Sequence, residues 1–247
     1  MSAEGNIAFP GWMDRTVQLL GEEHVAKIRN AHVLVAGLGG VGSMAAEALV
    51  RAGVGKLTIV DHDLVQETNL NRQILALGSN IGEEKSAVIA GRMKDINPDV
   101  ELIEKSLYIN EETLDEIFDA GFDFVVDAID TLTPKILFIE KVVKNGLPLA
   151  SSMGSGGKLD PTMIKIADFK KSYNCRLAYI LRKKLRKRDV HGGFKVVFST
   201  ESTDKEKLRM SEDEPNKKSQ LGTISYIPMI FGCMLASIVI EGLRSGN

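Results

Sequence analysis

The sequence predicts an α/β fold: a doubly wound, Rossmann-like, mainly parallel sheet with a C-terminal substrate-shaping insertion and an apolar closing helix. Short apolar runs alternate with helical patterns through the first 154 of the 247 residues. A glycine-rich turn, GLGGVG at 37–42, follows the first run, and acidic residues follow the second and fourth. Strands and helices that alternate at this spacing are typical of β-α-β units, whose strands lie parallel.

The elements can be placed in chain order. The apolar residues of segment 14–30 recur at mostly helical spacing, which predicts one or two amphipathic helices. The strands are expected at 32–37, 56–61, 100–107, 122–130 and 147–154. The helices between them are expected at 43–52, 82–97, 112–121 and 134–146. Pro98 closes one of these helices and glycines end two others, as helix boundaries favour.

The C-terminal part has a different pattern. The apolar runs 163–169 and 194–201 predict strands on either side of a basic helix, and 205–222 predicts a polar, mobile loop. The apolar segment 226–243 predicts the closing helix. We therefore expect a nucleotide-binding core at 1–154 and, within the same globular unit, a substrate-binding insertion with the closing helix at 155–247.

Composition limits the class of protein. Charged residues make up 26% and the formal net charge is -2, which excludes a globally basic chain. The N-terminal segment has no secretory pattern, and the two cysteines form no CxxC pair, so we expect a cytoplasmic protein. The apolar run 224–240 is interrupted by Pro228 and Gly232, and we expect a core helix, in which Cys233 packs, rather than a membrane span.

The glycine turn predicts a nucleotide site. Glycines between a strand and a helix let backbone N–H groups approach a phosphate at the helix N-terminus. Asp61, at the end of the second predicted strand, stands where a carboxylate can bind ribose hydroxyls. The alternative is that the glycines only permit tight packing. These features fit NAD and ATP equally.

The residues after Asp61 separate the two nucleotides. Polar and charged residues follow at Asn69, Asn71, Arg72, Lys85, Asp127 and Asp130. Cations that clamp a polyphosphate and a carboxylate that can hold Mg²⁺ are what nucleotidyl transfer requires, whereas hydride transfer does not need them. The alternative for Arg72 and Lys85 is a position on a solvated helix face.

Spaced motifs carry a family resemblance. GLGGVG, D-x-D-x-V-x-x-T-N-L-N-R-Q, G-x-x-K and D-A-I-D, in this order within 14–154, resemble the adenylating family that includes ThiF, MoeB, HesA and the ubiquitin-activating enzymes. Among its subfamilies, the chain most resembles the tRNA threonylcarbamoyladenosine dehydratases of the TcdA or CsdL type. The segments that carry this resemblance are 15–23, 127–135, 154–162, 197–201 and the final apolar helix.

The resemblance implies roles for individual residues. Arg72 and Lys85 would stabilise the adenylation transition state, and Asp130 would hold Mg²⁺. Arg15 would reach the partner's site in a homodimer, although alone it reads as a surface residue. ATP would be bound by Gly37, Gly39, Gly40, Gly42, Asp61, Asp63, Asn69, Asn71, Arg72, Lys85 and Asp127. A monovalent cation, K⁺ or Na⁺, is a further candidate cofactor.

The resemblance also implies an activity. A tRNA threonylcarbamoyladenosine dehydratase uses ATP to adenylate and cyclise threonylcarbamoyl adenosine in tRNA, with loss of water. The alternative is an adenylyltransferase that activates the C-terminal Gly-Gly of a ubiquitin-like sulfur carrier, and the missing CxxC pairs count against it. S-Q-L-G-T stands where some relatives carry a cysteine, which counts against a sulfur relay through that position. A sulfur-transfer partner protein is still an open candidate. Cys175 could be a nucleophile but is expected to be a plain thiol.

A basic stretch, 169–190, offers an RNA-binding surface. The apolar residues Leu177, Leu181 and Leu185 recur on one helical face and would anchor it. The cations that could meet tRNA phosphates are Lys170, Lys171, Arg182, Lys183, Lys184, Arg186, Lys187 and Arg188. The alternative is a merely solvated face.

Overall fold

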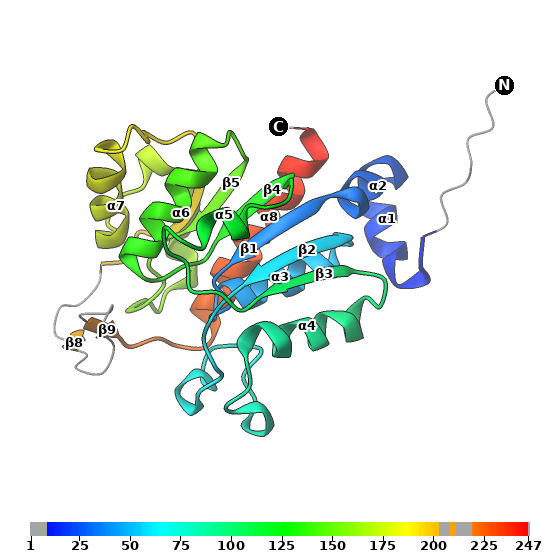
Figure 1. The fold of residues 1–247 in the computed structure, drawn as a ribbon, viewed down its shortest axis with the longest axis horizontal. Helices are drawn as coiled ribbons and strands as arrows, with labels where there is room; N and C mark the ends of the chain where they lie inside the picture. The colour runs from blue at the N-terminus through cyan, green and yellow to red at the C-terminus, as the bar shows by residue number, and fades with distance from the viewer. Residues whose placement is uncertain (1–8, 203–207, 211–218, 247) are drawn as a thin grey trace.

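The computed structural model describes residues 9–202, 208–210 and 219–246. Its main sheet has seven strands in the order β3-β2-β1-β4-β5-β7-β6 (Figure 1). The strands are β1 His32–Ala36, β2 Lys56–Val60, β3 Glu101–Lys105, β4 Phe124–Asp127, β5 Leu149–Ser152, β6 Ile164–Asp168 and β7 Lys195–Ser199. All neighbours pair in parallel except β6, which is antiparallel to β7. The predicted doubly wound, mainly parallel sheet is confirmed.

Helices cover both faces of the sheet (Figure 1). The helices are α1 Asp14–Leu20, α2 Glu22–Asn30, α3 Gly42–Arg51, α4 Lys85–Ile96, α5 Leu114–Ile117, α6 Leu132–Lys144, α7 Arg176–Arg186 and α8 Tyr226–Ser245. Val33 and Val35 of β1 pack in one apolar core with α3, α4 and α8. Leu34 and Ala36 pack in a second core with α5, α6 and α7. Alternate strand residues thus face opposite layers, as the pleat requires.

Helix α8 closes one layer of the fold. It packs along α3 and across β4, β5 and β7, and Phe231 and Leu235 are fully buried. In the described part of the chain it is the one helix long and apolar enough to cross a membrane, with 44% of its most apolar stretch buried in the protein. The expected core packing is confirmed for its inner face. The expectation that Cys233 packs is wrong, because this residue lies on the exposed side of α8.

The structure corrects two other predicted elements. The helix expected at 112–121 is reduced to the single turn of α5. The expected loop 205–222 contains an antiparallel pair, β8 Leu208–Met210 and β9 Ser219–Leu221, and residues 205–207 and 211–218 lie outside the described residues. The pair was missed because three-residue strands joined by main-chain hydrogen bonds leave no apolar alternation to detect. The strands predicted at 163–169 and 194–201 are present as β6 and β7, and they extend the main sheet.

Candidate nucleotide-binding site

The glycine turn lies at the point where the strand order reverses. The chain leaves β1 for β2 on one side, while β4 pairs with β1 on the other, so a crevice opens at the carboxyl ends of β1 and β4. Gly37 has φ +84°, and a Cβ there would lie 2.8 Å from the Ala128 carbonyl oxygen. Helix α3 begins at Gly42 directly after the turn. Backbone N–H groups at its N-terminus can therefore approach a phosphate.

Asp61 lies beside this turn. The Leu38 N–H donates to its Oδ2 at 2.6 Å and the Asp63 N–H donates to its Oδ1 at 2.8 Å. Burial raises the pKa of Asp61, and the charge of Lys85 and the two backbone hydrogen bonds oppose that rise. The turn and the end of β2 are thus joined through one carboxylate, in the position where ribose hydroxyls are recognised.

Lys85 is held at the first position of α4. Its Nζ lies 2.6 Å from Asp63 Oδ2, and its N–H donates to the Asp63 carbonyl at 3.0 Å. The Lys85 side chain is only 6% exposed, whereas that of Asp63 is 51% exposed. A phosphate that enters the crevice can therefore compete for Lys85 with a solvated carboxylate, which is easily displaced.

The NLNR segment, residues 69–72, lies against the glycine turn. A Cβ on Gly40 would lie 2.8 Å from the Arg72 carbonyl oxygen. The Arg72 guanidinium donates to the Thr68 carbonyl at 2.6 Å and to Asn71 Oδ1 at 2.8 Å. Asn69 is buried, and its Oδ1 accepts from the Gln66 N–H at 3.1 Å. Asn71 in turn donates to the Thr223 carbonyl, just before α8. The fold therefore brings together the predicted residues Gly40, Asn69, Asn71 and Arg72.

Gln73 is a site residue that the sequence did not single out. Its side chain is buried, and a Cβ on Gly39 would lie 3.8 Å from its Nε2. Gln73 Oε1 is buried and has no hydrogen-bond partner in the described residues. An unsatisfied buried carbonyl is costly, which makes it a mark of a ligand position. The one feature of the sequence that could have indicated Gln73 is its position directly after Arg72.

The end of β4 holds a buried ion pair. Asp127 and Lys135 are both fully buried, with Nζ 2.6 Å from Oδ2. Asp127 also accepts from the Ser151 hydroxyl at 2.6 Å and from the Ile129 N–H at 3.1 Å, and Lys135 donates to the Ile129 carbonyl. The pair therefore shapes the turn that leads to exposed Asp130. Lys135 was missed, and nucleotide contact by Asp127 stays a prediction.

Two carboxylates and one imidazole that could bind a metal ion lie next to the crevice. Asp61, His62 and Asp63 each bring one ligand atom to within 4.8 Å of the others. His62 Nε2 lies 3.3 Å from Asp63 Oδ1, and Lys85 also pairs with Asp63. The predicted ligand Asp130 follows β4, which is separated from β2 by β1. Carboxylate oxygens are ligands that Mg²⁺ prefers.

The G-S-G-G-K-L-D-P segment borders the same edge of the sheet. The Gly157 N–H donates to the Gly222 carbonyl, which joins this segment to the residues before α8. Lys158 is buried, donates to the Glu201 carbonyl, and has its pKa lowered by burial. The Glu201 carboxylate accepts from the N–H groups of Leu159 and Asp160, each at 2.9 Å. The loop after β5 is thus fixed from both sides.

Arg15 is not brought to this crevice within one chain. It is exposed on α1, next to Met13, whose methyl group packs where a Cβ on Gly53 would stand. Gly53 follows the C-terminal end of α3, while the glycine turn precedes its N-terminal end. Ten helical residues span roughly 15 Å, so Arg15 lies at the opposite edge of the sheet from the crevice.

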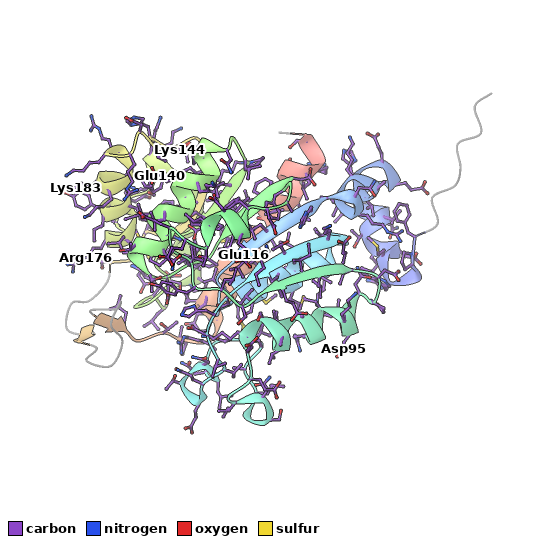
Figure 2. The ribbon with its side chains drawn as sticks, viewed as in Figure 1. Asp95, Glu116, Glu140, Lys144, Arg176 and Lys183 are labelled. Carbon is purple, nitrogen blue, oxygen red and sulfur yellow. The ribbon has the colours of Figure 1, made fainter. Side chains whose placement is uncertain are left out.

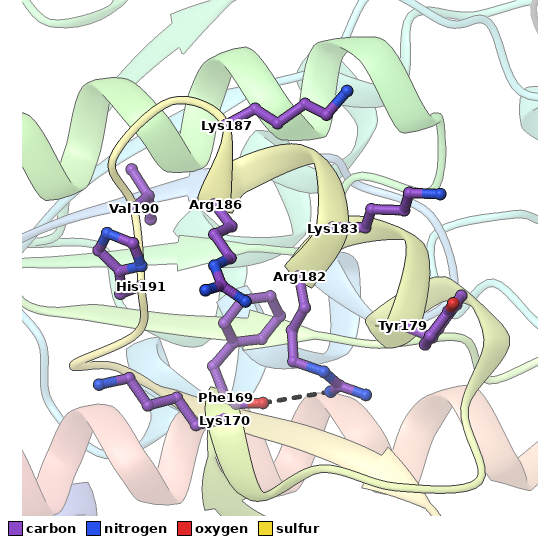
Figure 3. A pocket seen from close by; sticks show the side chains of 9 residues that line it. All are labelled: Phe169, Lys170, Tyr179, Arg182, Lys183, Arg186, Lys187, Val190 and His191. Carbon is purple, nitrogen blue, oxygen red and sulfur yellow. Dashed lines mark hydrogen bonds between the residues drawn. The ribbon is translucent and has the colours of Figure 1, made fainter.

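The basic stretch forms α7 and the loops at its ends. Ala178, Leu181 and Leu185 are buried against the second core, while Leu177 is half-buried. A pocket of about 960 Å³ is lined by Phe169, Lys170, Tyr179, Arg182, Lys183, Arg186, Lys187, Val190 and His191 (Figure 3). Of the remaining predicted tRNA contacts, Lys171 and Lys184 are exposed outside the pocket, and Arg188 pairs with Glu140 at 2.5 Å.

Known proteins resemble the chain over most of its length. The tRNA threonylcarbamoyladenosine dehydratase of Bacillus subtilis is 38% identical over 237 residues, 91% of each chain. The protein of the same name from Escherichia coli is 38% identical over 201 residues, 77% of this chain and 75% of that protein. The crystal structure of E. coli tRNA N6-threonylcarbamoyladenosine dehydratase, TcdA, in complex with ATP matches with a TM-score of 0.86 at 33% identity, over 98% of both chains.

A family model accounts for the same span. The ThiF family model matches residues 13–245, which include the glycine turn, the NLNR segment and α8. The matched region contains the whole seven-stranded sheet and the residues gathered around the crevice. The chain belongs to the ThiF family.

Proposed function

We propose that this protein is an ATP-dependent tRNA threonylcarbamoyladenosine dehydratase. The observation that carries the proposal is the glycine turn of a full-length ThiF fold, with Asp61, Arg72 and Lys85 gathered around it. The Ala128 and Arg72 carbonyl oxygens lie 2.8 Å from where Cβ atoms on Gly37 and Gly40 would stand, so close packing requires glycine at both positions, and the turn so formed leads directly into the N-terminus of α3, which favours a phosphate. The high coverage by dehydratases of two bacteria supports the choice of reaction.

The first chemical step is nucleotidyl transfer. A carboxylate oxygen of the threonylcarbamoyl group attacks the α-phosphorus of ATP, the bond to pyrophosphate breaks, and an acyl adenylate forms. Negative charge builds on the phosphoryl oxygens and on pyrophosphate during this step. The stabilisation of that charge is assigned to the side chains of Arg72 and Lys85; the packing of the Arg72 carbonyl beside Gly40 and the pairing of Lys85 with Asp63 support this assignment.

The second step closes a ring. The carbamoyl group of the same side chain attacks the activated carbonyl carbon, AMP leaves with the former carboxylate oxygen, and a proton is lost. The net change is the loss of one water from the nucleoside. Such intramolecular attack gains an effective molarity of about 10⁵ M or more, so no enzyme nucleophile is required. Buried Cys175 and exposed Cys233 have no role in this scheme.

Mg²⁺ is proposed as the metal cofactor. Bound next to the triphosphate it would neutralise the charge of the leaving pyrophosphate. Asp130 would be its protein ligand, and its place at the end of the β4 turn supports this assignment. A monovalent cation, K⁺ or Na⁺, is retained as a further candidate cofactor.

The proposed assembly is a cytoplasmic homodimer that acts on tRNA. Arg15 lies remote from the crevice of its own chain, which supports a role in the crevice of a partner subunit. The cations of α7 support RNA as the substrate. A sulfur-transfer protein remains a further candidate partner.

The proposal can be tested by mass spectrometry. The purified protein is incubated with ATP, Mg²⁺ and tRNA bearing threonylcarbamoyl adenosine, and the nucleoside is expected to lose one water as AMP and pyrophosphate appear. Arg72→Ala should abolish the reaction while the protein stays folded. If the nucleoside keeps its mass and a carrier protein ending in Gly-Gly becomes adenylated instead, the proposed substrate is wrong.

A further inference from the structure

The cationic pocket of α7 lies at the amino ends of the parallel strands, whereas the nucleotide crevice lies at their carboxyl ends. Asp168, the last residue of β6, pairs with Lys195, the first residue of β7, so both lie at the amino ends of the parallel strands. The pocket residues Phe169 and His191 belong to the loops at this edge. The N-terminal end of α7 is at the other edge, where Asn174 donates to the Thr200 carbonyl just past β7.

The distance between the two sites follows from the elements that separate them. The pocket cations Lys183, Arg186 and Lys187 lie in the C-terminal half of α7 and just past its end, roughly 10 to 16 Å along the helix from its start. Strand β7 is two strands away from β4, which adds about 10 Å across the sheet. A ligand must therefore extend on the order of 20 Å to touch the crevice and the pocket together.

The pocket carries concentrated, unneutralised positive charge. Its lining contains five Lys or Arg residues and no carboxylate. Within the described residues, none of these five forms an ion pair. Three acids lie nearby: Asp168 accepts from the Lys170 N–H at 2.8 Å, Glu140 binds Arg188 and Lys144, and Asp189 is exposed and is not part of the lining. The pocket therefore attracts an anion instead of closing on itself.

The arrangement of the cations fits an extended polyanion better than a single phosphate. Lys183 and Lys187 are one helical turn apart, about 6 Å, and Lys170 lines the pocket from the segment before α7, with its side chain extended to the side opposite these two lysines (Figure 3). Figure 2 shows Lys183 and Arg176 on the outer side of α7, at the rim of the molecule. Arg182 alone is anchored, by the Ser172 hydroxyl and the Phe169 carbonyl. Exposed arms at a regular spacing match the repeating charges of a nucleic-acid backbone.

We propose that this pocket is an accessory site that binds the backbone of the substrate RNA away from the nucleoside that reacts. The inference rests on the proposed function. An A-form RNA duplex rises by less than the ~3.4 Å per base pair of DNA, so a separation on the order of 20 Å corresponds to about seven base pairs. An RNA with a stem of that length can occupy both sites at once. A shorter fragment that carries the reactive nucleoside occupies the crevice alone.

The test compares tRNA binding at several salt concentrations. In the double variant Lys183→Gln/Lys187→Gln, the slope of log affinity against log salt should fall by about two, because each phosphate contact contributes roughly one unit. The charge-conserving double variant Lys183→Arg/Lys187→Arg serves as the matched control and should leave the slope unchanged, because it keeps both positive charges. Equal slopes in the wild type and the double variant would overturn the accessory site.

Activity on two substrates separates this inference from the proposed function. The double variant should raise the KM for modified tRNA about tenfold or more and leave kcat unchanged, while the KM for a trinucleotide carrying the same modified adenosine stays at the wild-type value. An equal rise of both KM values would place the two lysines at the crevice and contradict the inference. Loss of dehydration by the wild type on both substrates would instead contradict the proposed function.

Discussion

At the residue scale, Gln73 places an unsatisfied amide next to the glycine turn. Whichever way this amide is turned, one of its polar atoms faces the Gly39 side and the other is buried. Neighbouring polar groups are satisfied within the fold: Asp61 accepts two backbone N–H groups, and Asp127 accepts from Lys135, Ser151 and Ile129. The unsatisfied oxygen of Gln73 therefore lowers the free energy of unfolding of the protein without nucleotide, and a hydrogen bond from a bound nucleotide can offset that loss.

Substitution of Gln73 tests that reasoning. Gln73→Met removes both polar atoms at similar volume, so the free energy of unfolding without nucleotide should stay equal or rise, whereas the dissociation constant for ATP should increase about tenfold, the worth of ~1.4 kcal/mol. Urea unfolding and titration calorimetry measure the two quantities. Gln73→Glu should weaken ATP binding further through repulsion of the phosphates. A destabilised Gln73→Met protein with normal ATP affinity would assign Gln73 a purely structural role.

The sequence predicted part of this site and missed the rest for a physical reason. Asp61, Arg72 and Lys85 carry chemistry in their residue type and follow strand ends, so their convergence could be expected. Lys135 and Lys158 read as ordinary surface lysines, because only the packed fold shows that they are buried. Cys233 was misjudged because an apolar helix does not reveal which of its faces is covered.

At the element scale, Glu47 ties α3 to α4. Its side chain is 5% exposed, and its carboxylate pairs with Arg51 at 2.8 Å and with Arg92 at 2.6 Å. Burial would raise the pKa of Glu47, but the hydrogen bonds and charges of the two arginines outweigh it and lower the pKa below 4.5. The ionised form is therefore favoured in the folded state. Its stabilisation is present above pH 4.5 and is lost as the pH falls through the folded-state pKa.

Glu47→Gln should therefore destabilise the protein in a pH-dependent way. At about pH 7 the free energy of unfolding should fall by about 2 kcal/mol, the worth of hydrogen bonds to a charged group, and the difference from wild type should shrink in acid. Urea unfolding at several pH values measures this. Exposed Glu23, paired with Lys27 on α2, provides the control, and Glu23→Gln should change little. A deficit that is constant with pH would refute the role of the charge.

The sequence predicted the elements of the main sheet better than those of the insertion. Apolar runs such as Phe124–Asp127 are buried on both faces, and their continuous apolarity marks a parallel strand. Strand β6 lies at the edge with its outer residues exposed, and neither its antiparallel direction nor its place beside β7 could be inferred from spacing. The pairing of β6 with β7 puts the cationic pocket at the amino ends of the parallel strands. The sequence therefore could not predict the position of the pocket either.

At the scale of the whole molecule, the carboxyl ends and the amino ends of the strands carry different groups of residues. The glycine turn lies at the carboxyl ends of the strands, together with Asp61, Arg72 and Lys85. Arg15 of α1 and the cations of α7 lie at the amino ends. A single chain thus separates its proposed chemistry from the surfaces proposed to contact a second subunit and the body of the RNA. Each proposed contact forms only when its partner is bound, the second subunit in one case and the RNA in the other.

Subunit mixing tests the proposed role of Arg15. Arg15→Ala and Arg72→Ala should each be inactive alone. In a heterodimer of the two, one crevice combines an intact Arg72 with the partner's intact Arg15, so an equal mixture after subunit exchange should regain about one quarter of wild-type activity. Mixed dimers isolated with two affinity tags each hold one intact crevice of two, so they should have about half of the wild-type activity. Fully formed heterodimers without activity would show that Arg15 does not act across the interface.

The most direct test of the central claim follows one oxygen atom. Threonylcarbamoyl adenosine labelled with ¹⁸O in its carboxylate is incorporated in tRNA and converted in unlabelled water with ATP and Mg²⁺, and the AMP is examined by mass spectrometry. Adenylation followed by ring closure predicts that each AMP carries one ¹⁸O and that the cyclic product keeps one. Unlabelled AMP together with a cyclised product would contradict the adenylate, and with it the function assigned to the crevice.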